Sequence, residues 1–399
     1  MSWYQVIEQA IESRHWLHRR PELTWEEKDT AVYIRDQLSN MGISWRACAT
    51  FGTVATLAPD SPGEHLAFRS DMDALPISET ADVDFCSEVP GKMHACGHDG
   101  HMAALLGLAN WLKQNEDRLN GPVSLLFQPA EEGGHGARKM VEDGALDGVD
   151  AIFGWHNWPA LPAGMAVCPD GVVMSGNGTF HMTIQGRGGH ASQPEAARDP
   201  VVAAAAITLN MQQIVSRRLP PQVAAVVTVA SIIADSGVTV IPDQVKIEGS
   251  IRISDPAWRQ QINELIVDIA NNTSATYGVS ADVEIRPRYE ATVNHPVPAQ
   301  RYRDALLAEL GEGFDHADIL VPIMASEDFS YYLQAIPGAF ALVGMSEQVA
   351  DRASFQHPCH SPEYEFNDRV IEPVIRVFSR IAGIPVDAAE TGQTTHSNA

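Results

Sequence analysis

Positively charged residues are scarce in this sequence. Its 399 residues include 27 Lys and Arg against 51 Asp and Glu, which gives a formal net charge of -24 at pH 7. A surface of this sign repels phosphate backbones, so we expect no nucleic acid partner. Metal cations would offset part of the negative charge, and the remainder is expected on the solvated surface.

Cysteines are also few, and long apolar runs are absent. The five cysteines are odd in number and widely scattered, which excludes a disulfide framework and is typical of a reducing cytoplasm. No run approaches the ~18 apolar residues that a membrane-spanning helix needs. Residues 1–23 lack the basic start and the apolar segment of a signal peptide. We therefore expect a cytoplasmic protein that does not associate with membranes.

Three short apolar runs in the first half of the sequence are each followed by polar side chains. Buried strands that carry functional groups at their carboxyl ends are typical of an open, mostly parallel sheet covered by helices. The sequence therefore predicts an α/β fold. The runs are His65–Phe68, followed by Asp71 and Asp73; Val123–Phe127, followed by Glu131 and Glu132; and Ala151–Trp155, followed by His156.

The pattern of elements changes near Ser175. Between residues 176 and 289, strand and helix signals follow the order βαββαβ, which is that of a ferredoxin-like unit. The earlier pattern then resumes. We therefore predict a domain of residues 176–289 inserted into a domain made of residues 1–175 and 290–399, with a disordered tail over residues 386–399. Near the start of the chain, Thr24 and Glu27 predict a capping box for a helix over residues 24–41.

The densest group of potential metal ligands is the segment Met93–His101, which holds one Cys, three His and one Asp. Such a cluster is costly to bury unless it binds something. Thiolate and imidazole ligands select zinc and transition metals. Taken alone, Cys96 and His98 are equally compatible with a buried Cys beside an exposed His.

Other segments strengthen the prediction of a metal site. Adjacent acids such as Glu131 and Glu132 repel each other unless a cation is shared. His156 and His360 are each ambiguous in isolation. Side chains from separate segments then make five ligands, enough for two metal ions with positions open for water: Cys96, His98, Glu132, His156 and His360.

Two such ions roughly 3.5–4 Å apart can share a hydroxide and polarise a carbonyl group. The reaction then needs a base for the proton of water and a donor for the developing oxyanion. Glu131 suits the base, because it lies next to a ligand without being obliged to bind metal. His190, in the turn Gly186–His190, suits the oxyanion donor, although a surface turn residue explains the same pattern.

The sequence resembles the M20 metallopeptidase family, and within it the amidohydrolase branch. That branch contains hippurate hydrolases, N-acyl-amino-acid and auxin-conjugate hydrolases and N-acetyldiaminopimelate deacetylases. The matching stretches follow the order of the family and run across nearly the whole chain. They are Leu17–Leu23, Arg69–Pro76, Met93–His101, Gln128–Glu132, Gly189–Ser192, Val240–Pro242, Ser326–Phe329 and His360–Pro362.

The resemblance implies a di-metal catalytic domain with an inserted domain that acts as a lid and forms a homodimer. It implies the same five ligands, Glu131 as general acid/base and Asp73 as a carboxylate that orients a ligand. It places His190 in the active site of the partner subunit and makes Arg252 a candidate for the substrate carboxylate. Thr239 stands where the family usually has Asn, which alters a substrate contact from this loop.

The predicted function is a metal-dependent amidohydrolase that cleaves N-acyl amino acids of the acetyl, benzoyl or indole-acetyl type. Mixed S, N and O ligands admit zinc, manganese, cobalt or nickel. One alternative is a di- or aminopeptidase acting on free N-termini, which the Cys96-Gly97-His98 motif disfavours because peptidase members usually carry an Asp-centred ligand set. The other is an inactive binding protein, which the retention of Glu131 and all five ligands disfavours.

Overall fold

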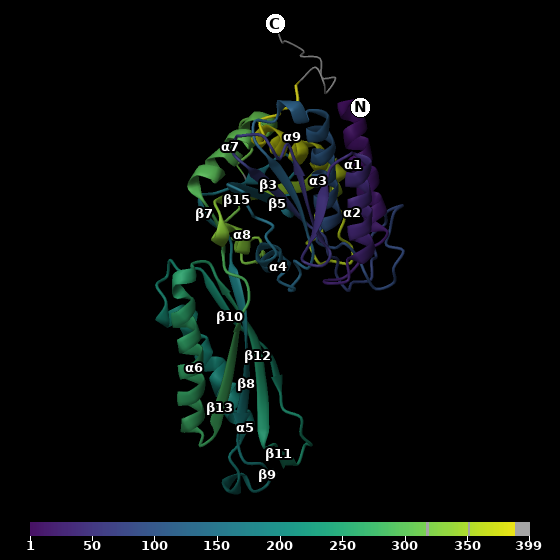
Figure 1. Ribbon diagram of the computed structural model, residues 1–399. Coiled ribbons are helices and arrows are strands. Elements are labelled where there is room, and N and C mark those ends of the chain that lie inside the picture. Colours follow the sequence, from purple (N-terminus) through teal and green to yellow (C-terminus); the bar gives the residue numbers. More distant parts are fainter. Residues whose placement is uncertain (317–318, 350–351, 388–399) are drawn as a thin grey trace. The chain divides into compact units, whose positions relative to one another are not determined.

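The computed structural model describes residues 1–316, 319–349 and 352–387 and divides into two compact units (Figure 1). The sequence predicted one domain of residues 176–289 and another of residues 1–175 and 290–399. The short segment Pro322–Glu327 differs, because it groups with the second unit, where Ser175 Oγ donates to the carbonyl groups of Met324 and Ala325. The first unit comprises Met1–Val173, Val293–Val321 and Asp328–Ala399, and the second comprises Met174–Thr292 and Pro322–Glu327.

The first unit is built on an eight-stranded sheet. Its strands are β1 Trp45–Cys48, β2 Gly52–Leu57, β3 Leu66–Asp71, β4 Val123–Gln128, β5 Ala151–Pro162, β6 Ala166–Val167, β15 Gly338–Val349 and β16 Arg352–Ser354. The order is β1-β2-β4-β3-β5-β15-β16, and β6 also pairs with β15. The central strands β4, β3, β5 and β15 run parallel, whereas the remaining pairs are antiparallel. The prediction of an α/β fold with a mainly parallel sheet is confirmed.

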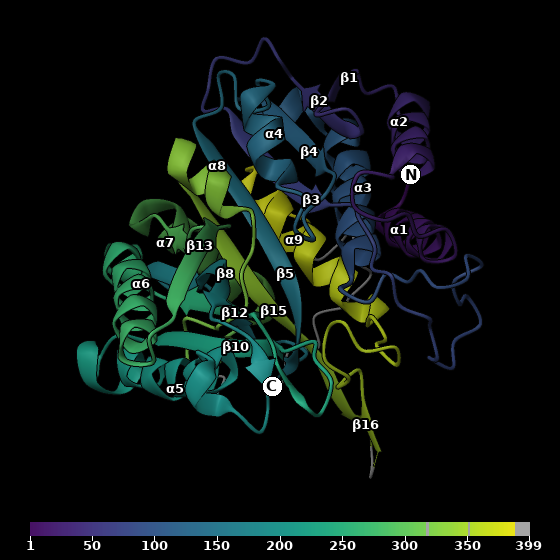
Figure 2. The same ribbon diagram turned by 90° about the horizontal axis from the view of Figure 1, so that it is seen from below.

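Helices of the first unit are α1 Trp3–His18, α2 Lys28–Asn40, α3 His98–Gln114, α4 Gly136–Glu142, α7 Pro296–Leu310, α8 Ser330–Ala335 and α9 Ile371–Ile381. α3 packs against α1, α9 and β3, and Figure 2 shows it between the two helices. Its sequence is rich in Ala, Leu and Gly, and every residue from His98 to Leu112 is buried. A helix buried on all sides is a rigid support for the side chain at its first position.

The second unit has the predicted order βαββαβ. Its main elements are β8 Gly176–Gln185, α5 Pro200–Met211, β10 Ala225–Ile233, β12 Gln244–Ile253, α6 Arg259–Thr276 and β13 Ser280–Pro287. The four strands form an antiparallel sheet in the order β10-β12-β8-β13, with the apolar sides of α5 and α6 in its core. Short strands β9 Gly189–His190 and β11 Val240–Ile241 pair at one tip of this unit (Figure 1). Two further strands, β7 Gly171–Met174 and β14 Thr292–Asn294, lie where the chain passes between the units.

Two local predictions were wrong. The capping box does not form, because α2 begins at Lys28 without a side-chain cap and Thr24 Oγ1 instead donates to Asp73 Oδ2 at 2.7 Å. His156 lies within β5 rather than after it, because pairing with β15 extends this strand to Pro162. Of the predicted disordered tail, residues 388–399 lie outside the described residues.

Within the described ranges, no helix is both long enough and apolar enough to span a lipid bilayer.

Candidate metal centre

The structure brings the five predicted ligand side chains together in the first unit. The donor atoms of Cys96, His98 and His156 all lie within 4.8 Å of one another, and so do those of Cys96, Glu132 and His360. Cys96 belongs to both groups and therefore joins them. The contributing segments are the turn that leads into α3 together with the first residue of α3, the loop after β4, strand β5 and the loop before α9.

His156 and His360 are each held in place by a contact with the backbone. His156 Nδ1 lies 2.6 Å from the carbonyl oxygen of Asn157, so this nitrogen carries the proton. Its Nε2 is then a lone-pair donor, and it lies 3.3 Å from Cys96 Sγ. The backbone N–H of His360 donates to the Ala95 carbonyl at 2.7 Å, and His360 Nε2 lies 3.1 Å from Glu132 Oε1.

His98 is positioned by a glycine with a left-handed backbone. Gly97 has a φ of 90° and directly precedes α3. A Cβ atom at this position would lie 2.2 Å from Asn157 Oδ1 and 2.5 Å from the Tyr364 hydroxyl. Only glycine satisfies both demands.

His98 is fully buried and lacks ordinary partners. Neither ring nitrogen makes a hydrogen bond of normal geometry within the described residues; the nearest carboxylates, on Asp71 and Asp73, approach to 3.6 and 3.5 Å. Burial lowers the pKa of His98, but the charge of Asp71 and then the interaction with Asp73 outweigh it and raise the pKa to about 10. The surrounding carboxylates thus favour a cation at this point. Buried ring nitrogens without hydrogen-bond partners, together with sulfur, nitrogen and oxygen ligand atoms nearby, fit a divalent metal such as zinc.

Asp73 fixes the backbone of the acidic pair. Its Oδ1 accepts the N–H of Glu131 at 2.9 Å, and its Oδ2 accepts the N–H of Glu132 at 3.0 Å and the Thr24 hydroxyl at 2.7 Å. Burial raises the pKa of Asp73, but His98 and these hydrogen bonds outweigh it, so the pKa lies below its ordinary value. The carboxylate therefore stays ionised and holds both glutamates in place.

Glu131 lies beside the group of ligand atoms. Its carboxylate, that of Glu132 and the His98 ring have atoms within 4.8 Å of one another. Its Oε1 accepts the N–H of Asp328 at 3.3 Å, and the side chain of Asp328 is anchored in turn by Arg69 at 3.0 Å.

The other three predicted site residues, His190, Thr239 and Arg252, belong to the second unit. Two of them are neighbours, and Arg252 lies apart from them. His190 and Thr239 are neighbours at the β9–β11 tip, where the N–H of Ala191 donates to the Thr239 carbonyl at 2.9 Å. Arg252 lies near the far end of β12 and donates to Ser326 Oγ at 2.6 Å. β12 has ten residues. At about 3.3 Å per residue, its ends lie roughly 30 Å apart. Within one copy of this unit, His190 and Arg252 are therefore well separated.

A family model described as Peptidase family M20/M25/M40 matches residues 67–383. The chain belongs to this family.

Relatives and solved structures agree with this membership. IAA-amino acid hydrolase ILR1-like 5 from Arabidopsis thaliana is 39% identical over 90% of this chain and 82% of its own length. N-acetyl-L-cysteine deacetylase from Bacillus subtilis is 39% identical over 91% and 85%. The crystal structure of the Bacillus subtilis YXEP protein, described as a dinuclear metal binding peptidase from the M20 family, is 31% identical with a TM-score of 0.80, over 95% of this chain and 98% of that chain. The chain is thus an enzyme, a hydrolase of the amidohydrolase kind.

Two further buried side chains at this M20 site, those of His101 and Arg69, were not predicted as site residues. His101 Nδ1 lies 2.6 Å from Asp71 Oδ1, and its Nε2 lies 2.7 Å from Asn157 Oδ1. Arg69 binds the other oxygen of Asp71 at 2.8 Å. One signal was available: His101 follows His98 by three residues, which places both on one face of a helix.

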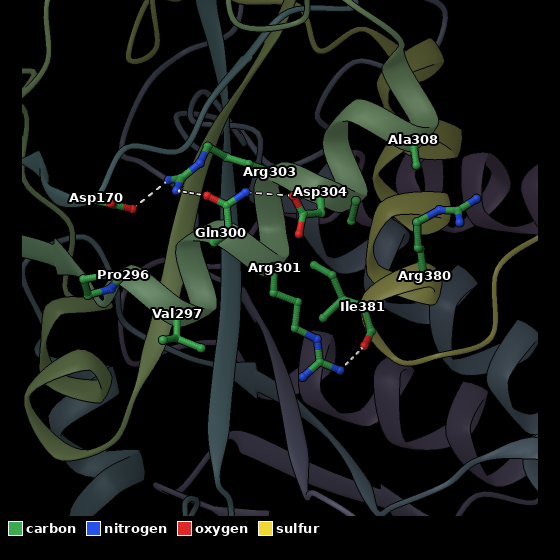
Figure 3. A pocket seen from close by; sticks show the side chains of 11 residues that line it. Asp170, Pro296, Val297, Gln300, Arg301, Arg303, Asp304, Ala308, Arg380 and Ile381 are labelled. Atoms are coloured by element: carbon green, nitrogen blue, oxygen red, sulfur yellow. Dashed lines mark hydrogen bonds and ion pairs between the residues drawn. The ribbon is translucent and has the colours of Figure 1, made fainter.

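A separate cavity of about 790 Å³ lies between α7 and the end of α9 (Figure 3). It is rich in arginine, but its guanidinium groups already have partners: Arg301 binds Glu64, Arg303 binds Asp170 and Arg380 binds Glu309. None of the clustered ligand residues lines it. This cavity is therefore not the metal centre.

The substitution Gly97→Ala tests how α3 positions His98. We expect it to lower the free energy of unfolding by about 3 kcal/mol or more, because it combines a left-handed backbone with a clash against Asn157. Gly91→Ala is the matched control, since Gly91 has a φ of 76° and open space around it, and should cost only about 1 kcal/mol. Urea unfolding and zinc stoichiometry measure both effects; equal losses in the two variants would contradict the account.

Proposed function

We propose that this M20 enzyme is a di-metal amidohydrolase that hydrolyses the amide bond of N-acyl amino acids. The observation that carries the proposal is the convergence of five S, N and O donors with a sixth side chain, Glu131, directly beside them. The printed names of two relatives at 39% identity support the substrate class, because one is a hydrolase of IAA-amino acids and the other a deacetylase of N-acetyl-L-cysteine.

In this proposal, Cys96, His98, Glu132, His156 and His360 hold two divalent ions, which are zinc, manganese, cobalt or nickel. When bound, the ions supply Lewis-acid activation of water and of the amide carbonyl. Asp73 holds His98 and the acidic pair in position, because it contacts the His98 ring and accepts hydrogen bonds from the backbone N–H groups of both glutamates. It is a positioning residue.

Glu131 is the general acid/base. Its backbone N–H is fixed by Asp73, and its carboxylate lies within 4.8 Å of ligand atoms of His98 and Glu132, where it would reach a water held by the ions. It takes a proton from water as the C–O bond forms and then delivers it to the nitrogen of the leaving amino acid. Hydrolysis requires both transfers, and one carboxylate can perform them in sequence.

The second unit supplies the substrate contacts. His190 donates to the developing oxyanion through Nε2, because its Nδ1 accepts from the backbone N–H and hydroxyl of Ser192 at 3.1 and 2.7 Å. Arg252 binds the substrate carboxylate: Ser326 occupies one donor of its guanidinium group, which has others to offer. Thr239, beside His190, contributes a single hydroxyl.

The same unit also forms the interface of a homodimer. β10 is an edge strand of its sheet, and edge strands present unpaired N–H and C=O groups to other chains. Ile232 and Ile233 on β10 are each 47% exposed, and Leu209 on the neighbouring α5 is 73% exposed. An apolar edge of this kind pairs with its copy about a two-fold axis. Dimerisation would explain how His190 and Arg252, far apart in one copy, serve one reaction: His190 enters the site of the partner.

Hydrolysis of a substrate panel tests the function. We expect chelator-treated enzyme to be inactive, and enzyme reloaded with Zn²⁺, Mn²⁺, Co²⁺ or Ni²⁺ to cleave N-acetyl, N-benzoyl or indole-acetyl amino acids but not free dipeptides. Cleavage of free dipeptides alone would instead assign the enzyme to the peptidases. Silence with every metal would refute hydrolysis at this centre.

Glu131→Gln tests the general acid/base. We expect turnover to fall by about 10²- to 10⁴-fold while metal content stays at the wild-type level, because the amide cannot accept the proton. Glu132→Gln is the matched control in the adjacent position, and it should lower metal content. Metal analysis and initial rates measure both variants; near-normal turnover of fully loaded Glu131→Gln would exclude Glu131 as the base.

Mixing two inactive variants tests the role of His190 across the dimer. His190→Ala should lower kcat while retaining metal. If subunits are then exchanged with Glu131→Gln, each mixed dimer regains one site with both residues intact. We expect about a quarter of wild-type activity, because half of the dimers are mixed and each carries one complete site. Loss of metal in His190→Ala, or no recovery on mixing, would contradict this role.

A further inference from the structure

A second thiol lies beside the proposed metal centre. Cys359 directly precedes His360, and Cys96 directly follows Ala95, so the two cysteines flank the backbone hydrogen bond between those two residues. The two thiols also contact neighbouring residues of β5: Cys96 Sγ lies 3.3 Å from His156 Nε2, and Cys359 Sγ lies 3.9 Å from Asn157 Nδ2. The backbone bond from His360 N–H to the Ala95 carbonyl holds the two segments together at 2.7 Å.

The two cysteines differ in their access to solvent. Cys96 is buried, whereas Cys359 is partly exposed. A small oxidant therefore reaches Cys359 first, with Cys96 directly behind it.

The other three cysteines have different surroundings. Cys48 and Cys168 are both buried, so an oxidant in solution reaches neither thiol directly. Cys86 is exposed, and its thiol donates to the carbonyl groups of Ala81 and Val83. It serves as an internal reference for an accessible thiol outside the pair.

We propose that Cys96 and Cys359 form an oxidation site, at which hydrogen peroxide joins the two thiols in a reversible disulfide and withdraws Cys96 from the metal centre. The proposal rests on the proposed function, because it takes Cys96 as a metal ligand. It adds a regulatory input: the same sulfur binds either metal or its neighbour.

The chemistry balances with one peroxide per disulfide. Cys359 sulfur attacks one peroxide oxygen, so an S–O bond forms, the O–O bond breaks, and the other oxygen leaves as water with the thiol proton. Cys96 sulfur then displaces the hydroxyl group of the Cys359 sulfenic acid. The S–S bond forms, and the Cys96 proton leaves with that group as a second water. The two sulfurs lose two electrons, and the peroxide gains them.

The geometry makes metal binding and the disulfide mutually exclusive. A disulfide bond is only about 2 Å long, so the two sulfurs must approach each other before it can form. Once bonded, Cys96 sulfur no longer has the thiolate charge that metal coordination requires. Conversely, a metal-bound Cys96 cannot act as the attacking thiol. Metal loading should therefore protect the pair.

Peptide mapping after oxidation tests the proposal in the full-length enzyme. Metal-free and zinc-loaded protein are treated with hydrogen peroxide, alkylated, digested without reduction and analysed by mass spectrometry, and zinc uptake is measured in parallel. We expect a peptide linked through Cys96 and Cys359 in the metal-free sample, loss of more than half of its zinc uptake, and recovery with dithiothreitol. The zinc-loaded sample should give several-fold less of the linked peptide.

Two variants separate the pair from general oxidation. Cys359→Ser should take up zinc, form no linked peptide and retain zinc uptake after the same exposure. Cys86→Ser, which removes an exposed thiol outside the pair, should behave as wild type. Absence of the linked peptide in metal-free enzyme that binds zinc normally would overturn the proposal and leave the proposed function intact. A linked peptide with unchanged zinc uptake would also overturn it, and would locate the error in the assignment of Cys96 as a ligand.

Discussion

The need to compensate buried negative charge is the constraint on which this structure depends. Asp71 and Asp73 are fully buried, and the carboxylates of Glu131 and Glu132 lie next to them around His98. Burying ions costs several kcal/mol each unless opposite charges and hydrogen bonds offset the loss of water. Arg69, the His98 ring and backbone N–H groups supply part of that compensation. In the proposed function, divalent cations supply the rest, so the buried charge that makes the site costly also favours metal binding there.

The parallel sheet explains why these groups meet. β3 and β4 are parallel neighbours, so the chain delivers Asp71, Asp73 and the acidic pair beyond the same edge. α3 starts at that edge and is buried along almost its whole length, which fixes the direction of His98. Gly97 permits the close approach of Asn157, and Asn157 in turn contacts His101 and lies near the Cys359 thiol. Asn157 therefore lies against both the segment that carries His98 and the segment that carries Cys359.

Much of this site could be predicted from the sequence because its side chains sit in short, distinctive segments. Cys96, His98, Glu131 and Glu132 each follow a recognisable break, and the structure brings them together with His156 and His360. Predictions from local sequence patterns were wrong where a residue or strand distant in the sequence binds the segment concerned. Thr24 has the spacing of a helix cap, yet its hydroxyl binds Asp73, 49 residues away. Pairing with β15 likewise carries β5 past His156. The separation of His190 from Arg252 follows from strand register, which no single motif encodes.

Anomalous X-ray scattering from crystals of the metal-loaded enzyme would locate the bound ions. We expect two peaks about 3.5–4 Å apart, enclosed by Cys96, His98, Glu132, His156 and His360, with Glu131 beside them but not coordinated. Peaks elsewhere, or a fully loaded enzyme with a single ion at this cluster, would contradict a di-metal centre built from these side chains.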